Sequence, residues 1–543
     1  MALKQDSTDT NQLVKFLIKC GANSSLVNVD IAGLGVSLRA LNALLEEDRN
    51  AMTGDPIEPY KTIFHGKFDR QYLKVAHHWN PKIVDQPNED SRTPLHCAVI
   101  QEDVERAVYL LSFGASVRAV GKRGNSPLHL AVSKNNEALV KILLCFDADY
   151  ELKNKDGQAP VEMKSTAAVA KIFTQLIKSK QSSMAADSGQ DLSDIIHFKQ
   201  EKAVDYQEAL EPEVRSKTIR LLSLDGGGIR GLCIGLMLLR IEKETRSKKI
   251  FDYFDWIAGT STGAIFALSL AEGFSVLDCM RFYLRLKDEV FPGTRPHDPT
   301  PLENFLKECY GNKNMDQVKN GKRVVVTTTK ADTNPPKLVM LRSYEMPKLV
   351  TLSIPPSEIK MWKAARCSSA APTYFPSVDK IYLDGGLIAN NPAPDLIGDV
   401  HHYNLQREYD GKDPLTVCCL LSLGTGRLPD QKLDGIDLEV SKGSGIVSFF
   451  SNMSNVYKNI KNLGNVFMEQ LATSDGAVVE RSRSWAHSLN IPYYRYTPQL
   501  EEECPLNTQS NEEVIKLMWT SKLYAESRSQ AEIQQIIRLL RAD

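Results

Sequence analysis

Ser261 has the sequence setting of a catalytic nucleophile. It is the central residue of GTSTG (259–263), which follows an apolar run and precedes a small-residue, helix-forming run at 264–271. When a strand turns sharply into a helix, a serine in the turn places its hydroxyl beyond the edge of the sheet. The N-terminus of the helix, with its partial positive charge, then points toward that hydroxyl. Gly259 and Gly263 allow the tight turn, since they carry no Cβ. The pattern therefore predicts chemistry at Ser261.

A second glycine turn, DGGGIRG (225–231), also lies between an apolar, strand-like run and a helix-forming run. Glycines at the start of a helix leave backbone N–H groups unshielded, and such groups bind anions or developing oxyanions. The motif glycines are Gly226, Gly227, Gly228 and Gly231. The same glycine spacing, G-x-G-x-x-G at 226–231, also fits a dinucleotide-binding fingerprint, with Asp252 about 20 residues further on. We favour acyl transfer, because a dinucleotide fold has no use for the turn at Ser261.

A serine hydroxyl needs a base within hydrogen-bond reach. Asp384 is the best candidate, because it ends a short apolar run and is followed by Gly385 and Gly386, which should bring it to the carboxyl edge of the sheet. An ordinary Asp-Gly turn is the plainer alternative. A triad with His401 or His402 also fits the chain order. That histidine pair lies in an amphipathic, helix-like run, so we favour a Ser/Asp dyad.

Composition limits the classes of function. The 543 residues are 42% hydrophobic and 24% charged, enough for several domains with large cores. The net charge of −1 gives no global attraction to nucleic acid, and any membrane contact must be local. We find neither a signal peptide nor a transmembrane run. The ten cysteines include no C-x-x-C pair, so we expect a cytoplasmic protein with buried thiols and neither metal nor cofactor.

A 33-residue repeat lies ahead of these motifs. T-P-L-H-C-A at 93–98 recurs as S-P-L-H-L-A at 126–131, and a decayed copy follows at Ala159. This period and motif are typical of ankyrin repeats, in which the histidines are structural. So short a stack is marginal alone, which favours contact with the other domain or with an unidentified ankyrin-binding protein.

The predicted organisation has three parts. An all-α ankyrin-repeat domain spans 1–175, with clear repeats at about 89–170, and a polar linker spans 176–215. From 216 to 543 strands alternate with helices, which predicts an α/β domain with a mainly parallel sheet and helices on both faces.

The motifs DGGGIRG, GTSTG and DGG, in this order, resemble those of patatin-like lipid acyl hydrolases. Ankyrin repeats ahead of them narrow the resemblance to the calcium-independent, group VI phospholipases A2. Longer stretches carry it as well: DEVFPGTRP (288–296), WKAARCSSAAPTYF (362–375), YLDGGLIANNP (382–392), SLGTGR (422–427) and the ending around 493–500. The resemblance covers essentially all of 216–543, and the ankyrin part only loosely.

The resemblance implies site residues and an activity. Ser261 would be the nucleophile, Asp384 the base, and the N–H groups of Gly227 and Gly228 the oxyanion hole. The substrates would be glycerophospholipids cleaved at the sn-2 ester without calcium, with lysophospholipase and acyl-CoA thioesterase side activities. Arg230 follows the glycines and could meet a phosphate, although a solvent-facing arginine is an equal alternative. The competing hypothesis is an ankyrin scaffold that carries an inactive lipase-like domain.

An amphipathic stripe suggests how the protein could reach lipid. Apolar residues recur every three or four positions, and Lys442, Lys458 and Lys461 lie nearby. The stripe consists of Ile446, Phe449, Met453, Val456, Ile460, Leu463, Phe467 and Leu471. It suits a membrane surface, a partner or the protein's own core. We therefore expect a cytoplasmic, peripherally membrane-associated protein. The resemblance also implies homodimers and inhibition by calmodulin, although the mixed-charge tail at 511–541 is a poor calmodulin target.

Overall fold

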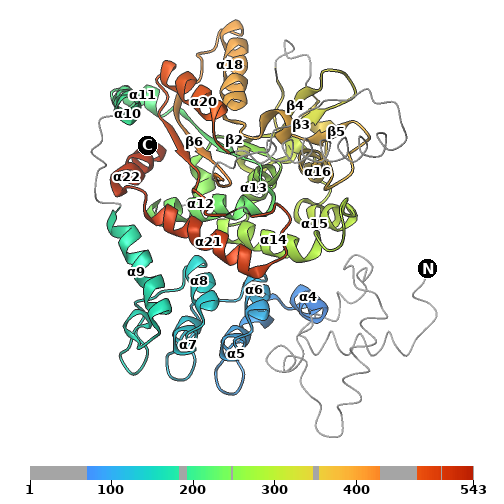
Figure 1. Ribbon diagram of the computed structural model, residues 1–543. Coiled ribbons are helices and arrows are strands. Elements are labelled where there is room, and N and C mark those ends of the chain that lie inside the picture. The colour runs from blue at the N-terminus through green and yellow to red at the C-terminus, as the bar shows by residue number, and fades with distance from the viewer. Residues whose placement is uncertain are drawn as a thin grey trace, which may run out of the picture. The chain divides into compact units, whose positions relative to one another are not determined.

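The computed structural model describes residues 70–182, 192–245, 249–346, 354–428, 474–502 and 504–541 (Figure 1). The chain divides into two compact units, Met1–Gln175 and Leu176–Asp543. Each is described by itself below. The predicted amphipathic stripe at 446–471 lies outside the described residues. None of the helices within the described ranges is long and apolar enough to cross a bilayer.

The first unit is all-α and contains the repeated helix pairs. Each clear repeat begins with a proline in the first helical turn, where the missing N–H costs nothing. The unit's helices are α4 (Arg70–Trp79), η4 (Pro81–Asp85), α5 (Pro94–Ile100), α6 (Val104–Ser112), α7 (Pro127–Ser133), α8 (Glu137–Cys145), η5 (Pro160–Glu162) and the start of α9 (Ala167–Ser182). In the decayed copy a single 3-10 turn, η5, replaces the first helix of the pair.

The repeat histidines connect one repeat to the next. The backbone N–H of Thr93 donates to His96 Nδ1 at 3.2 Å, so Nε2 carries the proton and donates to the Asn125 carbonyl at 3.1 Å. His129 repeats the arrangement with Ser126 and the Gln158 carbonyl. Burial lowers the pKa of both rings, which keeps them neutral. Both histidines are therefore structural, as predicted.

The second unit is built on a seven-stranded sheet in the order β4-β3-β2-β1-β6-β7, with β5 also paired to β3. The β3–β2–β1–β6–β7 pairs are parallel, and only β4 and β5 run antiparallel to β3. The strands are β1 (Ile219–Leu224), β2 (Trp256–Thr260), β3 (Arg323–Lys330), β4 (Lys337–Arg342), β5 (Tyr382–Asp384), β6 (Val417–Leu423) and β7 (Tyr493–Tyr496). The prediction of a mainly parallel α/β sheet is confirmed.

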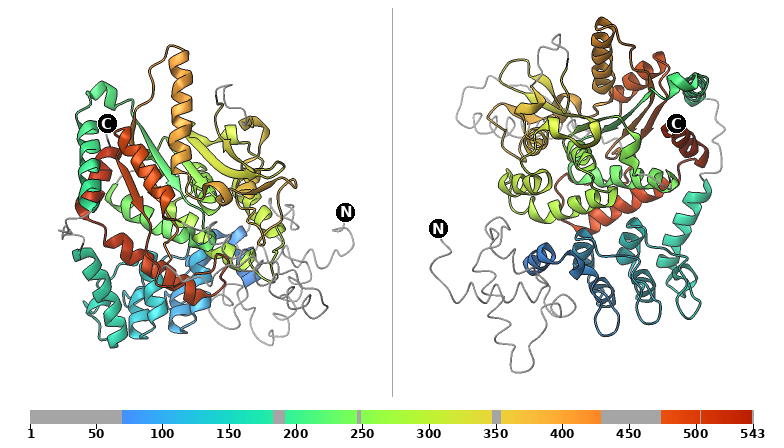
Figure 2. Two further views of the ribbon diagram at one scale, coloured as in Figure 1. Left: turned by 45° about the horizontal axis from the view of Figure 1, so that its top comes forward. Right: turned by 180° about the vertical axis from the view of Figure 1, so that it is seen from behind.

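Helices cover both faces of this sheet, again as predicted. Figure 1 shows α18 and α20 on one side and α12, α13 and α21 on the other, and the view from behind in Figure 2 agrees. Alternate residues of β1 and β2, such as Leu221 and Trp256, pack with α18 and α20 in one core. The helices are α10 (Leu192–Glu208), α11 (Pro212–Arg215), α12 (Gly231–Thr245), α13 (Thr262–Ala271), α14 (Val276–Glu289), α15 (Thr300–Tyr310), α16 (Met361–Ser368), α17 (Gly386–Ala389), α18 (Ala393–Tyr409), α20 (Ala477–Ser488), α21 (Asn511–Glu526) and α22 (Gln530–Leu540). Short 3-10 helices lie between them: η6 (Gly228–Arg230), η7 (Ile250–Tyr253), η8 (Met315–Gln317), η9 (Lys319–Gly321) and η10 (Pro356–Glu358).

Part of the segment expected to be a linker is helical. α10 and α11 occupy residues 192–208 and 212–215. The side-chain amide of Gln207 donates to the carbonyls of Val417 and Asn490, both at 3.1 Å. Helix α10 is thereby bonded to the beginning of β6 and to the residues just before β7.

Candidate active site

Ser261 lies at the junction between β2 and α13, in a strained conformation. Its φ is 50° and its ψ is −114°, a region that non-glycine residues seldom adopt and that is typical of functional turns. The turn brings backbone segments so close that a Cβ added to Gly259 would collide with the backbone of Gly263. The predicted strand–turn–helix is therefore present. The strand is shorter than the apolar run, because residues 250–253 form η7 instead.

The structure brings Ser261 and Asp384 together. Ser261 Oγ donates a hydrogen bond to Asp384 Oδ2 at 2.8 Å. The other carboxylate oxygen, Oδ1, accepts the backbone N–H of Gly386, also at 2.8 Å. The glycine after the turn thus orients the carboxylate and leaves Oδ2 for the serine. A hydroxyl bonded directly to an oriented carboxylate is the arrangement that an activated nucleophile needs.

Asp384 reaches this position by a different route from the one expected. The sequence predicts that the short strand before Asp384 ends at the carboxyl edge of the sheet, but β5 runs antiparallel to β3. Asp384 instead pairs with Thr328, next to Thr327, which pairs with Thr260 just before the nucleophile. Strand register, rather than strand direction, brings the carboxylate beside Ser261.

Burial changes the acidity of Asp384. The side chain is only 3% exposed, and desolvation raises the pKa of its carboxyl to about 7. The hydrogen bonds from Gly386 and Ser261, and the charge of Arg366, oppose this shift without cancelling it. A carboxyl with a pKa near neutrality is well matched to accepting and returning a proton at neutral pH.

The DGGGIRG loop presents two backbone donors to the cavity beside Ser261. Other backbone groups of the loop are bonded: the Gly226 N–H donates to the Asn390 carbonyl at 3.1 Å, and the Ile229 N–H to the Leu506 carbonyl at 3.0 Å. The Gly228 carbonyl accepts from Thr262 Oγ1 at 2.7 Å. Within the described parts of the chain, the N–H groups of Gly227 and Gly228 have no acceptor. Because buried backbone donors are rarely left unpaired, these two N–H groups are suited to receive a ligand oxygen.

An open, mainly apolar cavity of about 700 Å³ lies in front of these groups. Its polar lining includes Ser261, Asp384 and the two glycines, whereas most of the wall is aliphatic or aromatic. The apolar wall is formed largely by Ile229, Ile265, Leu286, Val290, Phe291, Leu302, Tyr374, Phe375 and Leu506. A pocket lined by hydrocarbon and bearing a few convergent polar groups suits a long acyl chain whose carbonyl meets the serine.

Three sequence hypotheses are not supported by the geometry. His401 and His402 are exposed on α18 and line no part of the cavity, so they form no triad with Ser261. Arg230 is 1% exposed, so its interpretation as a solvent-facing arginine was wrong; nor does it line the cavity, where a phosphate contact would be expected. Asp252 lies in η7, ahead of β2, rather than at the strand end that a dinucleotide fingerprint requires.

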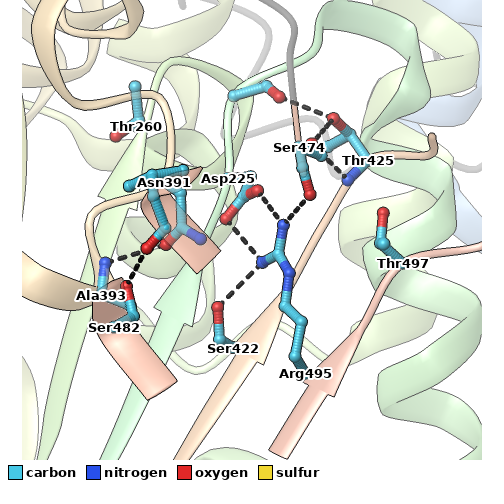
Figure 3. A network of polar contacts seen from close by, with 12 residues as sticks. Asp225, Thr260, Asn391, Ala393, Ser422, Thr425, Ser474, Ser482, Arg495 and Thr497 are labelled. Atoms are coloured by element: carbon cyan, nitrogen blue, oxygen red, sulfur yellow. Dashed lines mark hydrogen bonds and ion pairs between the residues drawn. The ribbon is translucent and has the colours of Figure 1, made fainter. Parts of the chain in front are cut away.

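Sequence reasoning missed the residues that hold these loops. Ser368, at the end of α16, accepts the backbone N–H of Ser261 on its Oγ at 2.7 Å. Figure 3 shows a second set, in which Arg495 of β7 meets Asp225, the first residue of the glycine loop, while Thr425 lies against the loop. The available signal was the resemblance around 362–375, 422–427 and 493–500, which gave no role to any of these side chains.

Comparisons with known proteins agree with this geometry. Residues 222–397 match the patatin-like phospholipase family, and residues 68–154 match ankyrin repeats in three copies. The chain is 36% identical over 351 residues to an intracellular phospholipase A2 of Caenorhabditis elegans, covering 64% of this chain and 32% of that protein. It is 36% identical over 337 residues to the 85/88 kDa calcium-independent phospholipase A2 of Rattus norvegicus, covering 59% and 40% of the two chains.

A more distant relative is the human calcium-independent phospholipase A2-gamma, with 28% identity over 348 residues and a coverage of 60% and 40%. The matched parts thus span about a third to two-fifths of these relatives' lengths. The resemblance noted from the motifs is confirmed: the chain carries ankyrin repeats followed by a domain of the patatin-like phospholipase family.

Proposed function

We propose that this protein is a calcium-independent phospholipase A2 that hydrolyses the sn-2 ester of glycerophospholipids through an acyl-enzyme. The observation that carries the proposal is the 2.8 Å hydrogen bond between Ser261 Oγ and Asp384, beside two unpaired glycine N–H groups and an apolar cavity. The names of the relatives supply the substrate class and the independence from calcium.

The proposed reaction needs only groups of this chain and water. Ser261 Oγ attacks the ester carbonyl carbon while its proton passes to Asp384 Oδ2. The carbonyl oxygen becomes an oxyanion that accepts from the N–H groups of Gly227 and Gly228. The C–O bond to glycerol then breaks, and the lysophospholipid oxygen takes the proton from Asp384. Water then attacks the acyl carbon while Asp384 takes its proton. The bond between the acyl carbon and Ser261 Oγ breaks, Asp384 returns the proton to Oγ, and the fatty acid is released.

Further properties extend this proposal. The same acyl-enzyme route accommodates lysophospholipids and acyl-CoA thioesters as side substrates. We place the protein in the cytoplasm, attached peripherally to a phospholipid surface. Homodimers and inhibition by calmodulin are proposals that follow from the resemblance alone, and an unidentified protein bound by the ankyrin repeats is a proposal that follows from the shortness of the repeat stack. The rival hypothesis, a scaffold with an inactive lipase-like domain, is disfavoured by the bonded Ser261–Asp384 pair.

Vesicle hydrolysis tests the proposal. Purified protein is mixed with phosphatidylcholine vesicles that carry different acyl chains at sn-1 and sn-2, in buffer containing EGTA, and the released fatty acid is identified. We expect the sn-2 acid and a lysophospholipid from the parent, and a loss of at least about 1,000-fold for Ser261→Ala. Circular dichroism confirms that the variant is folded. Equal release by the folded variant and the parent would refute the serine mechanism, and release of only the sn-1 acid would refute the positional assignment.

A further inference from the structure

Residues outside the family-matched segment hold the glycine loop in place. The patatin-like match ends at residue 397. Arg495 and Asp225 form an ion pair whose side chains are 5% and 0% exposed, in which Nη1 and Nη2 donate to the two carboxylate oxygens at 3.0 and 2.5 Å. Such a two-pronged arginine–carboxylate contact fixes orientation as well as charge. Because Asp225 directly precedes Gly226, the pair fixes the beginning of the loop.

The strand order explains how Arg495 reaches the loop. β7 pairs with β6, and β6 pairs with β1, so Arg495 extends across one strand to the end of β1. On its way Nη1 donates to Ser422 Oγ of β6 at 2.8 Å. Figure 3 shows the guanidinium between Asp225, Ser422 and Ser474.

Thr425 connects the Asp225–Arg495 pair to the glycines of the loop. Its Oγ1 donates to the Gly226 carbonyl at 2.6 Å. Ser474 Oγ lies 3.0 Å from the Thr425 hydroxyl and accepts the Thr425 N–H at 3.1 Å, while its carbonyl accepts from Arg495. The side chain of Thr425 also occupies the space that a Cβ at Gly227 would need. Asp225, Thr425, Ser474 and Arg495 are called the loop anchor below.

The loop anchor acts on the peptide unit that carries one of the two N–H groups left without an acceptor among the described residues. The Gly227 N–H belongs to the same peptide group as the Gly226 carbonyl that Thr425 holds. A planar peptide group turns as a unit, so fixing its oxygen fixes the direction of its N–H. We propose that Thr425, supported by the Asp225–Arg495 pair, is a positioning residue that aims the Gly227 N–H at the oxyanion. This inference rests on the proposed function, since it assigns a task within the same reaction.

The test compares variants that remove single hydroxyl groups from the same neighbourhood. Thr425→Val removes the hydroxyl that holds Gly226, and Thr425→Ser keeps it. Thr497→Val is the matched control, because the Thr497 hydroxyl is buried nearby and has no partner within the described residues. Arg495→Lys is a second probe, which keeps the buried charge but loses the planar fork. Active sites are titrated with a fluorophosphonate, so every rate refers to folded, reactive enzyme.

We measure kcat and KM on a soluble p-nitrophenyl ester and the inhibition constant of an alkyl trifluoromethyl ketone, whose adduct with serine carries an oxyanion. We expect Thr425→Val and Arg495→Lys to lower kcat about 10- to 100-fold and to raise the inhibition constant by a similar factor, with KM nearly unchanged. Thr425→Ser and Thr497→Val should behave like the parent.

The outcomes separate this inference from the proposed function. A parent protein that neither reacts with the fluorophosphonate nor hydrolyses ester overturns both. A reactive parent whose Thr425→Val and Arg495→Lys variants keep kcat and the inhibition constant per titrated site overturns the positioning role alone. Lower thermal stability with unchanged rates per site would show a purely structural role, and it would also overturn the inference.

Discussion

Burial decides what Asp384 can do. An exposed aspartate is ionised at neutral pH and too weakly basic to take a proton from a serine hydroxyl efficiently. Here desolvation raises the carboxyl pKa to about 7, while the Gly386 N–H keeps one oxygen oriented. Near neutral pH, part of the protein therefore carries a protonated Asp384, which cannot accept a proton from Ser261.

The pH dependence of the reaction follows from this shift. Below the pKa, each unit of increase in pH raises the fraction of ionised Asp384 about tenfold. We therefore expect kcat/KM to rise about tenfold per pH unit up to about pH 7 and to level off above it. The measurement is initial hydrolysis of a neutral, soluble ester between pH 5 and 9, with unfolding monitored at each pH. A rate that is already flat from pH 5 upward would contradict the assignment of Asp384 as the base.

At the scale of elements, the end of α16 joins the turn at Ser261 to the turn at Asp384. Ser368 Oγ accepts the Ser261 N–H at 2.7 Å, and the Ser368 carbonyl accepts the Gly385 N–H at 3.2 Å. Two residues on, the Ala370 carbonyl accepts the Asp384 N–H at 3.0 Å. One helix terminus thereby holds both turns, although the turns are 123 residues apart in the sequence.

Removing one of these bonds should lower turnover without changing substrate binding. Ser368→Ala leaves the Ser261 N–H unpaired, at a cost of about 1–3 kcal/mol, and frees the strained turn to relax. We expect kcat to fall about tenfold or more, with KM within twofold of the parent. Ser482→Ala serves as the control, because it removes a buried hydroxyl whose hydrogen bond, among the described residues, lies within α20. If both variants match the parent in kcat per titrated site, the helix terminus has no positioning role.

The sequence predicted those features that depend on neighbouring residues, and it did not predict contacts between residues that are distant in the chain. The turn at Ser261 is local, since its glycines are needed wherever a strand turns sharply into a helix, and it was predicted with its neighbours. Asp384 was predicted at the right edge for the wrong reason, because nothing in the sequence reveals that β5 runs antiparallel. The pairing of Asp225 with Arg495 spans 270 residues. Only the strand order makes that contact possible, so no local pattern could reveal it.

At the scale of the whole molecule, the site is assembled from parts that are distant in the chain. The cavity lining runs from Gly227 to Leu506, and the loop anchor adds Thr425 and Arg495. The parallel sheet makes this possible, because the carboxyl ends of β1, β2 and β6 meet at one edge. A ligand bound to Ser261 should therefore slow amide hydrogen exchange in segments that contribute no side chain to the proposed reaction.

Amide hydrogen exchange tests this expectation. Under the proposed mechanism, the adduct of a fluorophosphonate with Ser261 places a phosphonyl oxygen where the oxyanion would lie, so that it accepts from the Gly227 and Gly228 N–H groups. We expect exchange to slow about tenfold in peptides covering 225–231, and to slow measurably in those covering 422–428 and 504–509, because the loop is bonded to both segments. Peptides covering 401–409, the exposed end of α18, serve as the reference and should not change. Slowing that stays confined to 259–263 would show that the glycine loop does not hold the oxyanion.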